Sequence, residues 1–111
     1  RFMRDAALAF ADLKRRGDLE TMTEDLVVEG HLVVYFQHHA EAKLAHIRHS
    51  DILNITSYSH NCLPHSHTCV DVLHAIGKAG EFRSTIAKIQ TIQGVDKVSF
   101  VVAPLREDGC C

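Results

Sequence analysis

Four side chains of the types that bind transition metals lie within about one-fifth of the sequence. They are His49, His60, Cys62 and Cys69. Residues two apart on a β-strand point to the same face, so His60 and Cys62 would share a face with their Cα atoms roughly 6.5 Å apart. Cys69 follows a short loop and would begin the next antiparallel strand. We therefore expect His60, Cys62 and Cys69 to converge in a spacing that suits ligands of one metal ion.

Three arrangements of this cluster are consistent with its residue types. His60 and the two cysteines could pack as a reduced trio without metal, because free cysteine behaves as a small hydrophobic residue. Cys62 and Cys69 could instead form a disulfide across the hairpin, given an oxidant and suitable geometry. We favour the third arrangement, metal ligation, because paired Cys and His residues in a cytoplasmic protein more often indicate a metal than a disulfide.

The other histidines have simpler interpretations. His65 and His67 lie in the predicted hairpin loop, where polar side chains are normally solvated. His38 and His39 would begin a helix and are also expected to be solvated, although either pair could form a minor metal site. His74 shares a predicted strand face with apolar residues, which indicates a core or interface histidine.

The composition limits the chain to one small domain, with or without a fragment of a second. Its 111 residues are 46% hydrophobic and carry a net charge of −2, so a core can form and the chain is not an obvious nucleic-acid binder. Nine histidines are the anomaly, since histidine is the commonest metal ligand. Neither a signal peptide nor an apolar run of about 18 residues is visible. We expect a cytoplasmic protein that does not enter the membrane.

Changes in hydrophobic period divide the chain into four parts. Residues 1–17 form a predicted helix that ends at Gly17, 18–25 a polar linker, 26–104 the main domain and 105–111 a tail containing Cys110 and Cys111. Within the main domain we expect strands at 26–36, 52–62, 69–76 and 95–102, with helices at 40–49 and 81–93. A turn is expected at 77–80. This β-α-β-β-α-β order predicts an α+β, ferredoxin-like fold with two helices on one face of an antiparallel sheet.

The segment "SYSHNCLPHSHTCVDVLHAIG" resembles the metal-binding core of the nickel-responsive regulator NikR family. That family joins an N-terminal ribbon-helix-helix DNA-binding domain to a C-terminal ACT-like domain of ferredoxin-like fold. In it, a His-x-His pair and a Cys that opens the next strand supply three ligands, and a fourth His comes from a neighbouring subunit. Here His49 stands eleven residues before His60, the family's spacing, and Cys69 opens the strand "CVDV". The resemblance covers about residues 27–104.

The resemblance also suggests what precedes the main domain. Residues 1–16 look like the second helix of the ribbon-helix-helix unit, with Arg4 matching the arginine of the family's "IRD" and therefore expected near DNA. The strand and first helix of that unit would be missing, so the chain would be truncated at its N-terminus.

The site departs from the family pattern at one ligand. Cys62 stands where the family has the second histidine of its pair, and the loop before Cys69 is one residue longer. The ligand set that the resemblance implies is therefore His49, His60, Cys62 and Cys69. Nickel is the metal by resemblance, whereas two thiolates with two imidazoles suit tetrahedral zinc or cobalt equally well.

From this resemblance we expect a metal-responsive transcriptional regulator and not an enzyme. It would form a homo-oligomer, a tetramer by analogy, and bind operator DNA through the N-terminal domain when loaded with metal. The alternatives are a metal storage or delivery module without DNA function and a zinc hydrolase. Against a hydrolase, Asp71 is the nearest carboxylate and is not placed as an obvious general base.

Overall fold

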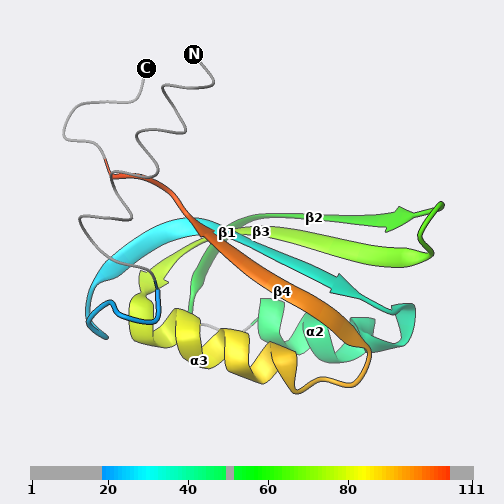
Figure 1. Ribbon diagram of the computed structural model, residues 1–111, viewed down its shortest axis with the longest axis horizontal. Helices are drawn as coiled ribbons and strands as arrows, with labels where there is room; N and C mark the ends of the chain where they lie inside the picture. Colours follow the sequence, from blue (N-terminus) through cyan, green and yellow to red (C-terminus); the bar gives the residue numbers. More distant parts are fainter. Residues whose placement is uncertain (1–18, 50–51, 106–111) are drawn as a thin grey trace, which may run out of the picture.

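The computed structural model describes residues 19–49 and 52–105. Its elements run in the order β1 (Val27–Phe36), the 3-10 helix η1 (His38–Ala40), α2 (Glu41–Arg48), β2 (Asn54–Leu63), β3 (Thr68–Lys78), α3 (Ala79–Gln90) and β4 (Val95–Val102). The strands form one antiparallel sheet in the order β2-β3-β1-β4. Figure 1 shows α2 and α3 together beneath one face of this sheet. The predicted α+β, ferredoxin-like arrangement is confirmed.

The boundaries of the elements differ from the prediction where pairing overrides a local signal. Gly77 was expected in a turn, but it pairs with Val28 of β1, and β3 continues to Lys78. As a result α3 begins at Ala79, without an intervening turn, and ends at Gln90. β2 begins at Asn54, two residues later than expected, and still contains His60 and Cys62. β4 has the predicted limits.

The expectations for residues 1–18 and 106–111, including the N-terminal helix, Arg4, Cys110 and Cys111, lie outside the described residues. No helix in the part of the chain that the structure describes is long and apolar enough to cross a membrane.

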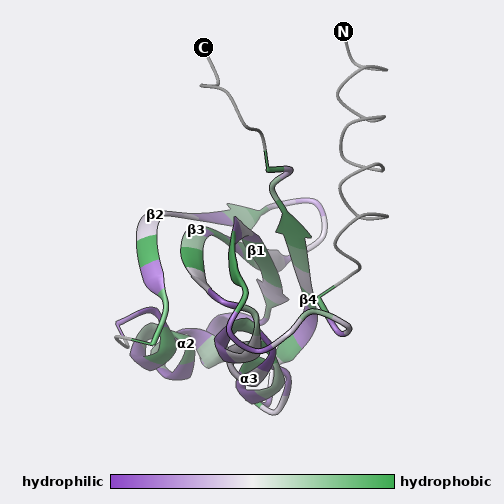
Figure 2. Ribbon diagram, turned by 90° about the vertical axis from the view of Figure 1, so that its left-hand side faces the viewer, coloured by the Kyte–Doolittle hydropathy of each residue, from purple (hydrophilic) through white to green (hydrophobic). Residues whose placement is uncertain are grey.

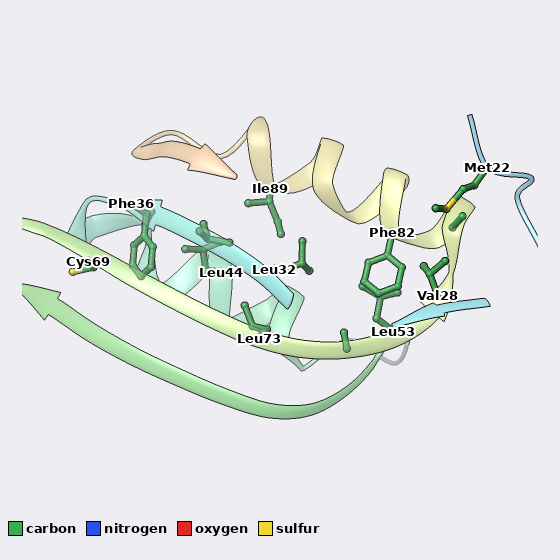
Figure 3. Packing of buried hydrophobic residues seen from close by; sticks show 14 residues of the cluster. Met22, Val28, Leu32, Phe36, Leu44, Leu53, Cys69, Leu73, Phe82 and Ile89 are labelled. Carbon is green, nitrogen blue, oxygen red and sulfur yellow. The ribbon is translucent and has the colours of Figure 1, made fainter. Parts of the chain in front are cut away.

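The hydrophobic core lies between the sheet and the two helices. Even-numbered residues of β1 point into it, as the alternating burial of that strand shows, because side chains of a strand alternate between faces. Phe82 of α3 stacks on Phe100 of β4 with ring centroids 4.3 Å apart. Phe36 and Cys69 are buried at the opposite end of the core, as Figure 3 shows. The core therefore reaches the end of the β2–β3 hairpin that is next to its turn, where Cys62 pairs with Cys69.

The opposite face of the sheet has no helix over it among the described residues, and Figure 2 shows both helices on the same side. Apolar side chains remain exposed there, among them Tyr35 and Val101, which is 63% exposed. An antiparallel sheet tolerates one solvated face, but exposed apolar side chains on it favour contact with another surface.

Candidate metal centre

The β2–β3 hairpin brings together the three donors that strand alternation predicted. Cys62 lies opposite Cys69 in the register of the two strands, and His60 lies opposite Asp71. The Sγ atoms of Cys62 and Cys69 are 3.6 Å apart, and the Cys62 Sγ is 3.7 Å from Nε2 of His60. Donor atoms of all three residues lie within 4.8 Å of one another. The cluster is thus formed by one chain.

A buried carboxylate orients the imidazole of His60. Nδ1 of His60 is 2.7 Å from Oδ1 of Asp71, a residue that is 1% exposed. Because the carboxylate accepts hydrogen bonds, it favours the tautomer with the proton on Nδ1 and leaves Nε2 facing the two sulfurs. The same hydrogen bond raises the pKa of His60. The ring also packs 5.8 Å from that of Phe36, which limits its rotation.

Asp71 in turn connects the hairpin to α2. Arg48 donates from Nη1 to Oδ2 of Asp71 at 2.6 Å and from Nη2 to Oε1 of Glu41 at 2.5 Å. The guanidinium also lies over the ring of Tyr58, 4.6 Å from its centroid. Both oxygens of Asp71 therefore have partners, one on β2 and one on the last residue of α2.

A second oxygen of Glu41 faces the same histidine. Oε2 of Glu41 lies 3.9 Å from Nδ1 of His60 and is buried without a hydrogen-bond partner in the described part of the chain. Two carboxylates thus surround Nδ1, while the sulfurs surround Nε2. Nδ1 of the imidazole therefore contacts the protein, and Nε2 remains available to bind a metal.

The two thiols have different environments. Cys62 is exposed, and its contacts with Cys69 and then His60 lower its pKa. Cys69 is 5% exposed, and burial raises its pKa. Cys62 therefore loses its proton more readily, while the proton of Cys69 must be displaced at a greater cost when a metal binds.

His49, the fourth expected ligand, does not join the cluster within one chain. It caps the C-terminal end of α2 directly after Arg48 and is exposed. Neither group of potential metal donors that the described residues form includes it. Its expected role as a ligand to the site of a neighbouring subunit stays a prediction.

The remaining histidines lie away from the cluster. His74 is on the sheet face that the helices leave open, with Nε2 2.5 Å from Oε2 of Glu29 and with Nδ1 in contact with the Thr56 hydroxyl. The ring of His74 also lies 5.3 Å from that of His31. The surroundings of His74 are therefore polar, unlike the core between the sheet and the helices. The two pairs treated as solvated, His38 with His39 and His65 with His67, are exposed.

The supporting roles of Asp71 and Arg48 were not predicted from the sequence. Asp71 was considered only as the carboxylate nearest the ligands. Its position two residues after Cys69 places it on the same strand face, and this spacing was the available signal. Arg48 carried no comparable signal, because its contact with Asp71 depends on how α2 packs against the sheet.

Replacing Asp71 with asparagine should weaken metal binding by about 10- to 100-fold, the usual effect of losing the partner that orients a ligating histidine. The amide no longer balances the charge of Arg48 and no longer favours one tautomer of His60. Competition with a chromophoric chelator measures the affinity, after circular dichroism has shown that the variant is folded. The control is Asp96→Asn on β4, which is exposed and far from the hairpin in sequence. Equal affinities for the two variants would contradict the supporting role of Asp71.

The donors fit a transition-metal ion in chemistry and in spacing. A tetrahedral zinc ion with Zn–S of about 2.3 Å and Zn–N of about 2.0 Å separates its donors by about 3.5–3.8 Å. The observed separations of 3.6 Å between the sulfurs and 3.7 Å between sulfur and Nε2 agree with this value. Three donors of this kind at this spacing suit ligation of one transition-metal ion.

Comparison with known proteins agrees with the fold. The model of the NikR C terminal nickel binding domain matches residues 30–103, about two-thirds of the chain. The match contains the hairpin with His60, Cys62 and Cys69 as well as His49. No curated protein matches the chain closely enough to be compared with it. The chain belongs to the family of the NikR C-terminal nickel-binding domain.

Proposed function

We propose that this chain is the metal-sensing part of a DNA-binding transcriptional regulator. The observation that carries the proposal is the convergence of His60, Cys62 and Cys69 on one hairpin, oriented by Asp71, in a member of a nickel-binding domain family. Asp71 is not free to act as the general base of a hydrolase, because both of its oxygens are already engaged.

The proposed mechanism is thermodynamic linkage between metal binding and subunit arrangement. His60, Cys62 and Cys69 of one subunit would hold the metal together with His49 of a second, so that a bound ion would link the two subunits. Such a site is complete in only one quaternary arrangement, so that arrangement becomes more populated when the metal is present. His49 is exposed at the end of α2, where a second chain can reach it.

Two features of the fold support this linkage. Arg48 stands next to His49 and donates a hydrogen bond to Asp71, which in turn orients His60. Helix α2 is therefore also connected to the metal donors of its own chain. The open face of the sheet carries exposed apolar side chains such as Val27 and Val101, which suit burial in a homo-oligomer. We infer a tetramer that presents N-terminal DNA-binding domains, with Arg4 near the operator, and that represses in its metal-loaded form in the cytoplasm.

The proposal also concerns the identity of the metal. Family membership favours nickel, whereas two thiolates favour zinc or cobalt. Elemental analysis of the protein purified without a tag, which would itself bind metals, tests the choice directly. We expect about one transition-metal ion per chain, and a preparation that retains none after growth with added metal would contradict the proposal.

His49→Ala should abolish metal-driven assembly while leaving three donors in each chain. We expect the wild-type chain to be a dimer or tetramer and to shift to the larger species when zinc or nickel is added, because His49 completes the site between subunits. Light scattering coupled to size-exclusion chromatography measures the change. The matched control, His46→Ala, removes an exposed histidine one turn earlier on α2. A wild-type monomer with and without metal would remove His49 as an intersubunit ligand.

Selection from a random DNA library, using the natural full-length protein with and without metal, tests the regulatory function. Metal-dependent enrichment of one sequence is the expected result. Tight metal binding without any DNA enrichment would point instead to a storage or delivery module.

A further inference from the structure

The hairpin that carries the metal donors also has the geometry of a redox-active cysteine pair. We propose that Cys62 and Cys69 form a reversible intrachain disulfide, which makes this hairpin a site of oxidative modification. The proposal goes beyond metal-dependent regulation, and formation of the disulfide can be tested without metal or DNA.

The pairing of the strands places the two cysteines within reach of a covalent bond. Cys62 and Cys69 are direct partners across adjacent antiparallel strands. Directly opposed residues in such a pair have Cα atoms about 4.5–5.5 Å apart, within the range that disulfides span. Their sulfurs already lie 3.6 Å apart, and a disulfide needs about 2.0 Å. Rotation of the side chains closes most of this gap, so the sheet does not have to rearrange.

The difference in exposure assigns separate roles to the two thiols. Cys62 is exposed at the edge of the hairpin and can meet a reagent in solution. Cys69 is 5% exposed and packs in the hydrophobic core cluster, so an external disulfide cannot easily approach it. Cys62 is therefore the attacking thiol, and Cys69 is the resolving thiol that reacts only with Cys62.

A low-molecular-weight disulfide such as oxidised glutathione is a sufficient oxidant. The Cys62 thiolate attacks one sulfur of that disulfide, forms a mixed disulfide and releases one small thiolate. The Cys69 thiolate then attacks the Cys62 sulfur and releases the second. Two electrons pass from the protein dithiol to the oxidant, and the two protein protons end on the released thiols.

Formation of this bond excludes metal ligation at the same site. Both sulfurs lose the anionic lone pairs with which thiolates bind a metal, and His60 would be left as the single donor of the intrachain trio. Oxidation should therefore release a bound ion, and reduction should restore the site. Because Cys62 stands where the family pattern has a histidine, this competition depends on a departure from that pattern.

The experiment uses a Cys110→Ser/Cys111→Ser background, so that only the hairpin thiols remain. We expect the metal-free protein treated with oxidised glutathione to lose both thiols, gain no glutathione and lose the mass of two hydrogen atoms. The tryptic peptide 49–78 contains both cysteines, and after oxidation it should take up iodoacetamide only once it has been reduced. After oxidation, zinc retention on a desalting column should be lost and then return with a reductant. Unreacted thiols, or oxidised protein that retains zinc as before, would overturn the proposal.

Single variants in the same background test the assigned order of attack. Cys69→Ser should accumulate a stable glutathione adduct on Cys62, because the resolving thiol is absent. Cys62→Ser should remain largely unmodified, because Cys69 is buried. Equal labelling of the two variants, or disulfide-linked dimers of the parent protein, would contradict the intrachain mechanism.

Discussion

Replacing Cys69 with alanine is expected to lower the metal affinity of the chain by at least about 100-fold, since the loss of an outer partner already costs 10- to 100-fold. The substitution removes one of the two thiolates and leaves the ion with weaker donors. His60→Ala should have an effect of the same order for the same reason. Competition titrations with zinc, nickel and cobalt against a chelator of known affinity measure these losses.

The matched controls are His65→Ala and His67→Ala, which remove potential donors from the exposed hairpin loop. We expect them to change the affinity little. Because Cys69 belongs to the core cluster, its variant must be shown to remain folded, and His60, which is only partly buried, provides the independent test. If the loop variants were the damaging ones, the assignment of the ligands would be wrong.

Changing Cys62 to histidine should shift the preference for zinc over nickel towards nickel by about tenfold or more, because an imidazole replaces a soft thiolate and restores the donor pattern of the family. The change should also weaken the pH dependence of binding. In the wild-type protein two thiol protons must leave, and the raised pKa of Cys69 extends this competition to higher pH. Affinity therefore falls as the pH is lowered, and with a single thiol the fall is less steep.

Zinc and nickel competition at several pH values measures both effects, and the absorption spectrum of the nickel form reports its geometry. The conservative comparison is Cys62→Ser, which removes the thiolate without supplying an imidazole and should weaken the binding of both metals. A wild-type protein that already prefers nickel, with the spectrum of a planar site, would show that Cys62 does not set the selectivity.

Strand alternation made the core of the site predictable from the sequence. His60 and Cys62 are two residues apart, and Cys69 follows a short loop, so their convergence required only that the hairpin form. The fold could be predicted for a similar reason, since each strand and helix has its own hydrophobic period. The end of β3 was predicted wrongly because Gly77 signals a turn locally, whereas the structure pairs it with Val28.

The parts of the site that depend on tertiary or quaternary contacts could not be predicted in this way. Arg48 reaches Asp71 only because α2 packs beneath the sheet, and no spacing in the sequence encodes that distance. His49 is exposed in a single chain, so its role is decided by how chains associate.

The position of β2 at the edge of the sheet has a consequence for kinetics. β2 supplies two of the three donors and pairs with β3 on one side only. Edge hairpins open locally at a lower free energy than the whole domain unfolds. An ion can therefore enter or leave while the core between β1, β3 and α3 stays intact. We therefore expect the release of an ion held there to depend on fraying of the hairpin and on separation of the subunits more than on global unfolding of the domain.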